Sequence, residues 1–117
     1  MRHRGVAACC LAGAGALAHG AQSAEPQGAS LAQSVCTACH VVAAHQERVP
    51  ILKSVAPSFC EIANRPGSSA HSVAHFVTTT HWDESMTGYR MPDPMLTADQ
   101  ANAVARYVMQ LRGQCSF

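Results

Sequence analysis

The sequence predicts an all-α domain of about four short helices. Apolar residues recur every three to four positions in several segments, and two capping boxes precede such segments. Turn-forming residues separate them, and the one β-like run, Val77–Thr80, is short. With 117 residues, one small domain is expected.

The segment 1–23 has the layout of a secretory signal peptide. Arginines give it a charged start, the run Gly5–Ala18 is apolar, and small residues follow. Cleavage after Gly20 or Ser23 fits this pattern. An uncleaved anchor is the alternative, although the apolar run is shorter than the roughly 18 residues of a spanning helix. We therefore expect a mature, exported domain over residues 24–117.

Composition and charge exclude several classes of protein. The formal charge is +1, and loss of the two leader arginines lowers it to −1. Nucleic-acid binding, which needs clustered positive charge, is therefore not expected. The 48% hydrophobic content argues against disorder. Aromatic residues make up only 5%, so the core is short of bulky side chains. A small domain of this kind usually needs a disulfide, a metal or a cofactor for stability.

The first helix is expected over residues 26–40. Leu31, Val35 and Cys39 recur there at helical spacing, and a proline stands in the first turn, where it is tolerated. Residues 41–56 lack such a pattern and contain a proline, so we expect a loop.

Two short helices and a longer one follow. Ser58 and Glu61 form a capping box, and Pro66-Gly67 ends that helix. Ser69 is placed to cap the next helix, whose expected inner residues are Val73, Phe76 and Val77.

A second capping box, Thr97 with Gln100, opens the last helix over residues 98–112, and Gly113 ends it. Its expected inner residues are Ala101, Val104, Ala105, Val108 and Leu111.

The most informative motif is Cys36-Thr37-Ala38-Cys39-His40. C-x-x-C-H is the attachment signature of a c-type haem, because two thiols one helical turn apart can each form a thioether and the histidine can ligate the iron. A thioredoxin-like redox pair would need a βαβ context. A zinc site built from Cys36, Cys39, Cys60 and one histidine would lack a closely spaced second pair.

Together with three further segments, this motif makes the chain resemble class I cytochromes c, which are small single-haem electron carriers. The resemblance runs from Gly28 to Leu111. The segment Ala56-Pro57-Ser58-Phe59 resembles the proline segment of the family, and Met91-Pro92 with Leu96-Thr97 resembles its methionine loop. Val104-Ala105-Arg106-Tyr107-Val108 resembles the last helix, which in the family crosses the first one with an aromatic residue at the crossing.

The resemblance implies one covalent haem c whose iron lies between His40 and Met91. It also implies that the carbonyl of Pro57 accepts a hydrogen bond from His40. Thioether sulfur raises the reduction potential of such a haem. Other residues remain open as the sixth ligand of the iron: Met95, Met86, His81 and His75.

The stretch 81–90 is longer and more polar than the family pattern before the methionine. Trp82 and Tyr89 within it either bond a haem propionate or wall the pocket. Arg48, Arg65 and Arg90 are propionate candidates on charge alone, with a solvated surface role as the alternative.

Cys60 and Cys115 are the remaining cysteines of the mature chain. In an oxidising compartment a disulfide between them is expected. The alternative is two separate thiols.

The sequence therefore predicts a periplasmic, monomeric carrier of single electrons that is not an enzyme and has no membrane span in its mature part. Its expected partners are redox proteins: a donor dehydrogenase or cytochrome complex, and an acceptor oxidase or reductase. Lys53 is the only lysine, so steering by a strongly basic face is not expected. The alternatives are a haem-based sensor of small ligands and a dedicated electron-transfer subunit of one dehydrogenase or oxidase complex.

Overall fold

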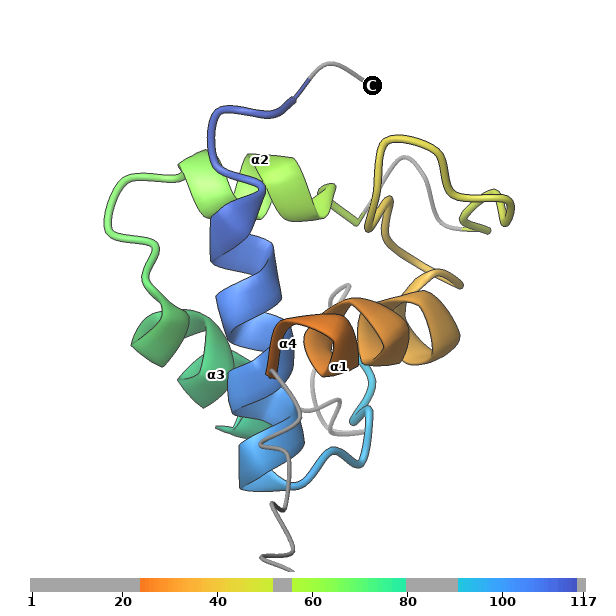
Figure 1. The fold of residues 1–117 in the computed structure, drawn as a ribbon. Helices are drawn as coiled ribbons and strands as arrows, with labels where there is room; N and C mark the ends of the chain where they lie inside the picture. The colour runs from red at the N-terminus through yellow and green to blue at the C-terminus, as the bar shows by residue number, and fades with distance from the viewer. Residues whose placement is uncertain (1–23, 52–55, 80–90, 116–117) are drawn as a thin grey trace, which may run out of the picture.

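The computed structural model describes residues 24–51, 56–79 and 91–115 (Figure 1). Within these ranges the regular elements are helical, with no strand, which confirms the all-α prediction. No helix among them is long and apolar enough to cross a membrane. The signal-peptide prediction falls on residues outside the described ranges. The elements in chain order are α1 (Ala24–Leu31), a π-helical turn η1 (Ala32–Cys36), α2 (Phe59–Asn64), α3 (Ala70–Thr79) and α4 (Ala98–Gln110).

Helix α4 is the platform on which the other helices pack. Helix α1 lies across its middle, α3 lies beside it, and α2 lies near its C-terminal end (Figure 1). The crossing of α1 and α4 is close: a Cβ placed on Gly28 would lie 2.2 Å from the carbonyl oxygen of Ala103 and 3.0 Å from the Cβ of Tyr107. Glycine is therefore required here, since only a residue without a side chain lets the two backbones approach this far.

The predicted capping boxes are confirmed. The hydroxyl of Ser58 accepts a hydrogen bond from the backbone of Glu61, and that of Thr97 accepts one from Gln100. In each box the second side chain bonds back to the cap backbone. Ser69 caps α3 as expected, because its hydroxyl accepts from the backbone N–H of Ser72 at 3.1 Å.

The core is made mainly of small and β-branched side chains, in keeping with the low aromatic content. Its largest fully buried side chains include Val42, Val104 and Val108. Phe59 is the buried aromatic ring of this cluster, and it meets Tyr107 edge-on with centroids 6.4 Å apart. The other members of the buried cluster are Ala32 and Ala63.

The first helix differs from the prediction. Regular α-helix ends at Leu31, one π-turn continues to Cys36, and turns follow, whereas helix was expected to His40. A π-turn adds a residue to the turn and so shifts the faces of the helix. Val35, expected by its spacing to share a face with Leu31, is consequently 40% exposed.

The end of the last helix is closer to its prediction, whereas one inward residue of α3 differs. Helix α4 ends at Gln110, two residues early, and Gly113 has φ +78° as a C-terminal stop requires. Phe76, expected to face inward on α3, is 49% exposed. It nevertheless forms part of the wall of a cavity.

Candidate functional site

A cavity of about 380 Å³ lies between the CxxCH turn and the helices. Cys36, Cys39, His40, Pro57 and Met91 all line it. The structure thus brings the five predicted site residues to one cavity, although they are up to 55 positions apart in the chain. The remaining wall is mostly apolar and includes Phe59, Ile62, Val73, Phe76, Val77, Leu96, Val104 and Val108.

The CxxCH segment is a compact turn that continues from η1. The N–H groups of Cys39 and His40 both donate to the carbonyl of Cys36, at 3.2 and 2.9 Å. Thr37 is buried, and its hydroxyl donates to the carbonyl of Gln33 at 2.9 Å. These bonds hold both thiols and the imidazole on one rigid turn beside the cavity.

The two thiols of this turn are unpaired. Burial raises the pKa of the Cys36 thiol to about 11, with a smaller contribution from the neighbouring Cys39. Desolvation disfavours the charged thiolate relative to the neutral thiol.

The ring of His40 is fixed by a backbone carbonyl. Its Nδ1 lies 2.7 Å from the carbonyl oxygen of Pro57, as the resemblance implied. A carbonyl only accepts, so Nδ1 carries the proton and Nε2 keeps a free lone pair. Partners of this kind fix the tautomer and raise the basicity of a metal-binding histidine. Pro57 is itself held in place, because the N–H of Phe59 donates to the carbonyl of Val41 at 2.9 Å.

A glutamine closes the loop that follows His40. The side-chain oxygen of Gln46 accepts from the N–H of Val42 at 2.6 Å, and its amide donates to the carbonyl of Arg48 at 2.6 Å. The hydroxyl of Tyr107 donates to the carbonyl of Val42 at 2.8 Å, which ties this loop to α4. Sequence reasoning missed Gln46, because a side chain that bonds loop backbone follows no periodic pattern.

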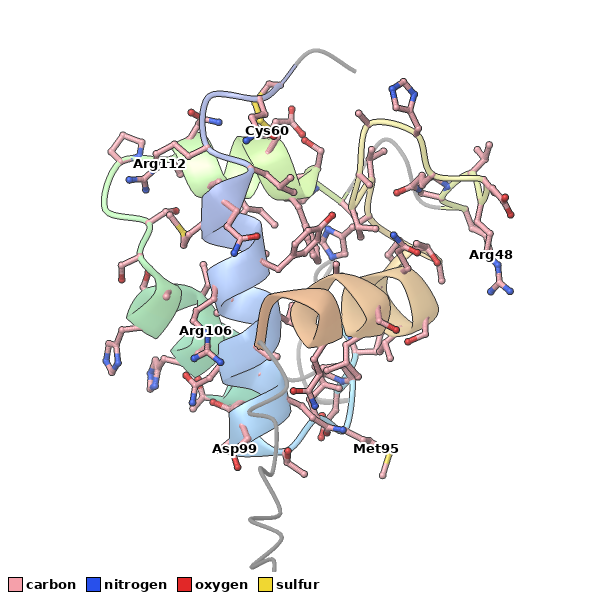
Figure 2. The ribbon with its side chains drawn as sticks, viewed as in Figure 1. Arg48, Cys60, Met95, Asp99, Arg106 and Arg112 are labelled. Atoms are coloured by element: carbon pink, nitrogen blue, oxygen red, sulfur yellow. A yellow bond between two sulfur atoms is a disulfide. The ribbon has the colours of Figure 1, made fainter. Side chains whose placement is uncertain are left out.

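Four methionine or histidine side chains were alternatives to Met91. Met95 is 86% exposed, does not line the cavity and points outward in Figure 2. His75 lies exposed on α3, also outside the cavity lining. Met86 and His81 lie outside the described residues. Among the described candidates, the geometry therefore favours Met91.

Of the three candidate arginines, Arg65 lines the cavity. Ser68 and Ser72 join it on the wall, so this is a polar part of an otherwise apolar lining. Arg48 is exposed and extends away from the helices (Figure 2). Arg90, Trp82 and Tyr89 lie outside the described residues.

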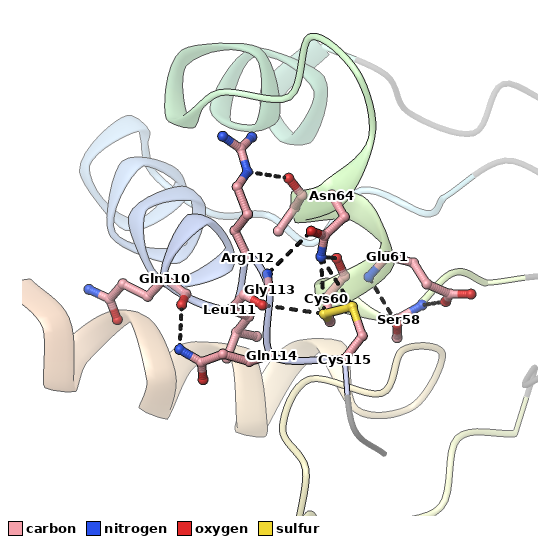
Figure 3. The surroundings of a disulfide bond; sticks show 11 residues. Ser58, Cys60, Glu61, Asn64, Gln110, Leu111, Arg112, Gly113, Gln114 and Cys115 are labelled. Carbon is pink, nitrogen blue, oxygen red and sulfur yellow. Dashed lines mark hydrogen bonds between the residues drawn. A yellow bond between two sulfur atoms is a disulfide. The ribbon is translucent and has the colours of Figure 1, made fainter.

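The remaining two cysteines, Cys60 and Cys115, lie close together near the C-terminal end of α4. The structure joins Cys60 to Cys115, with Cα atoms 5.4 Å apart (Figure 3). The amide of Asn64 lies 3.2 and 3.1 Å from the two sulfurs. In the described residues no three histidine, cysteine or acidic side chains gather as a metal site, which leaves the zinc interpretation without geometric support.

This covalent-attachment turn, with its histidine bonded to a proline carbonyl and a methionine on the same apolar cavity, is the site of a class I c-type cytochrome. The family model for cytochrome c matches residues 26–112, and the chain belongs to that family. It is 34% identical over 85 residues to "Cytochrome c-552" of Bradyrhizobium diazoefficiens, a match that covers 73% of this chain and 72% of the relative. No solved structure matches the chain significantly.

Membership of this family defines the cofactor and the general activity. The chain carries haem c with its iron, covalently bound, and it is a haem-based electron carrier that exchanges electrons with redox partners. The donor set fits this group: two thiols on one turn, an imidazole with a free Nε2, a soft thioether and apolar walls.

Proposed function

We propose that this protein is an exported, periplasmic carrier of single electrons rather than an enzyme. Cys36 and Cys39 would attach the haem through thioethers, and His40 and Met91 would be the axial ligands. One observation carries the proposal: the imidazole of His40, fixed by its bond to Pro57, and Met91 line the same apolar cavity.

When bound, the haem supplies a one-electron redox couple. The residues of the chain hold and tune it. The carbonyl of Pro57 keeps the proton on Nδ1 of His40, which leaves Nε2 for the iron. The thioether of Met91 favours the reduced iron and raises the reduction potential. The mostly apolar walls would limit contact of the haem with water, and burial of this kind is one of the factors that set its reduction potential.

The polar end of the cavity is proposed to receive a propionate group. Arg65 is the one candidate arginine among the described residues that lines the cavity, and a guanidinium suits a carboxylate because it can donate two parallel hydrogen bonds. The serines beside it on the wall, Ser68 and Ser72, are further donors.

We propose that residues 1–23 direct export and are removed, and that the carrier acts as a monomer of residues 24–117. Export also gives the oxidising surroundings in which Cys60 and Cys115 would form a disulfide. Mass spectrometry of the exported protein tests both points. An intact segment 1–23, or alkylatable thiols at Cys60 and Cys115, would contradict them.

The visible spectrum of the haem-matured protein tests the axial ligands. The oxidised protein is expected to show a low-spin spectrum with the weak long-wavelength band of a methionine–iron bond. Met91→Ala should lose this band and lower the reduction potential, because a soft ligand is removed. Met95→Ala is the matched control, since Met95 is exposed, and it should keep the band.

Two results would contradict the proposal. If the band survives in Met91→Ala, Met91 is not the ligand. If the wild-type protein is five-coordinate and its reduced form binds carbon monoxide rapidly, a sensor of small ligands is the better interpretation.

Electron-transfer kinetics with candidate redox proteins would identify the partners. We expect the rate constants of electron transfer to depend only weakly on ionic strength, because the chain is nearly neutral.

A further inference from the structure

Two histidines on α3 lie outside the haem site. His71 and His75 are one helical turn apart, both are exposed, and neither lines the cavity. Their rings are stacked, with centroids 6.4 Å apart and planes inclined by 13°. Side chains at positions i and i+4 of a helix project from the same face, so the two imidazoles are held as neighbours by the backbone itself.

We propose that His71 and His75 form a bidentate surface site for a divalent transition-metal ion such as Cu(II), Ni(II) or Zn(II). Water would complete the coordination shell. Imidazole nitrogen is a ligand that all three ions accept, and a histidine pair at i and i+4 is the arrangement by which helices hold zinc in other proteins. Both rings are exposed, so rotation about their side-chain torsions can bring one nitrogen of each to a common ion.

The scaffold of this pair is ordered independently of any metal. At the start of α3, Ser69 and Ser72 bond each other reciprocally, with each hydroxyl accepting from the backbone N–H of the other at 3.1 and 2.9 Å. The hydroxyl of Thr79 donates to the carbonyl of His75 at 2.6 Å. Ala74, between the two histidines, is buried. Binding therefore has to order only two side chains, which limits its entropic cost.

The side chains of α3 also predict which metal ions this pair of histidines prefers. Between Ala70 and Thr79 the helix has no carboxylate, and its titratable side chains are the two histidines. Ca²⁺ and Mg²⁺ prefer oxygen ligands, chiefly carboxylates, so the pair should discriminate against them. Among first-row ions the affinity should follow the usual order, with Cu(II) above Ni(II).

Titration of the haem-loaded, reduced protein with NiCl₂ tests the proposal. Ni(II) is paramagnetic, so its binding is followed by broadening of backbone amide resonances. For the wild type we expect broadening centred on residues 71–75. His71→Ala and His75→Ala should each weaken Ni(II) binding at this position at least about tenfold, the lower end of the loss seen when even an outer partner of a metal site is removed. His45→Ala is the matched control. It removes an exposed histidine from a loop, where the described residues include no second histidine four positions away.

The histidines are exposed, so the variants are expected to fold, and an unchanged haem spectrum verifies this. The proposal is overturned if His71→Ala binds Ni(II) at residues 71–75 as tightly as the wild type. It is also overturned if His45→Ala weakens binding equally, or if MgCl₂ broadens or shifts the same resonances with the same affinity. None of these results bears on the axial ligands of the haem.

Discussion

Replacing Gly28 by alanine tests the close crossing of α1 and α4. The added methyl group would lie 2.2 Å from the carbonyl oxygen and 2.8 Å from the carbonyl carbon of Ala103. Favourable contacts between such atoms need about 3.5 Å, so the helices must separate by on the order of 1 Å. Both clashing atoms belong to the backbone and cannot rotate away, so we expect a cost at or above about 3 kcal/mol, the upper end for overpacking.

Alanine also has a higher helix propensity than glycine, which returns about 1 kcal/mol. The expected net result is therefore a decrease of at least about 2 kcal/mol in the free energy of unfolding. It is measured by urea unfolding of the haem-loaded protein, followed by far-UV circular dichroism. Ser30→Ala is the matched control, because Ser30 is exposed on the same helix, and its effect should stay within about 0.5 kcal/mol.

An unfolding free energy for Gly28→Ala equal to that of the wild type would refute the reasoning. It would mean that the crossing does not depend on backbone contact. A second readout follows from connectivity, since α1 continues through η1 into Cys36. If α1 is displaced, the haem spectrum or the reduction potential of Gly28→Ala should change as well, whereas Ser30→Ala should leave both unchanged.

Three further predictions concern other contacts. Tyr107→Phe removes the hydroxyl that donates to Val42, so urea unfolding should show a loss of about 1 kcal/mol. A loss much below that would mean that water replaces the bond. Cys115→Ser opens a disulfide that spans 55 positions, for which the chain-entropy model gives a loss of about 4 kcal/mol. Equal stability of this variant and the wild type under oxidising conditions would show that the bond does not form. Finally, hydrogen bonds from Ser58 lower the pKa of Glu61 in the folded state. The ionised carboxylate therefore stabilises the fold at pH values above the unfolded pKa of about 4.3, and this contribution is lost as the pH falls through the folded pKa. In Glu61→Gln the free energy of unfolding should consequently decrease less at acidic pH than it does in the wild type. An equal decrease in the two proteins would contradict this.

Local signals in the sequence predicted the starts of helices well and the end of the first helix poorly. A capping box is formed by residues three apart, so Ser58 and Thr97 could be recognised without any tertiary information. The π-turn after Leu31 leads directly into Cys36, which lines the cavity together with His40. The apolar spacing of Leu31 and Val35 carries no trace of that turn, so the prediction continued the α-helix too far.

Some residues of the site could likewise be predicted from the sequence, and others could not. His40 and Met91 could be predicted because each belongs to a short motif, and the bond from His40 to Pro57 followed from the family resemblance. The role of Gln46 could not, because its partners are backbone atoms that any residue type would supply. Phe76 was predicted to be inward from its helical position, but its ring lies on the cavity wall while remaining half exposed.

The cavity wall formed by α2 is held by two kinds of connection, and these act on different states of the chain. In the folded state, Arg112 donates to the carbonyls of Ala63 at 2.8 Å and Ser68 at 2.7 Å. Asn64 accepts from the N–H of Gly113 at 3.2 Å (Figure 3). These bonds tie the C-terminal end of α2 to the chain just after α4.

The disulfide joins the same two segments, so it adds little to the position of α2 once the chain has folded. Its main effect is on the unfolded chain, whose conformational freedom it reduces. Reduction of the disulfide should therefore make unfolding easier without moving Phe59 or Ile62, the residues by which α2 lines the cavity. We therefore expect the position of the α2 wall to depend mainly on the hydrogen bonds of Arg112 and Asn64, whereas the free energy of unfolding depends also on Cys60 and Cys115.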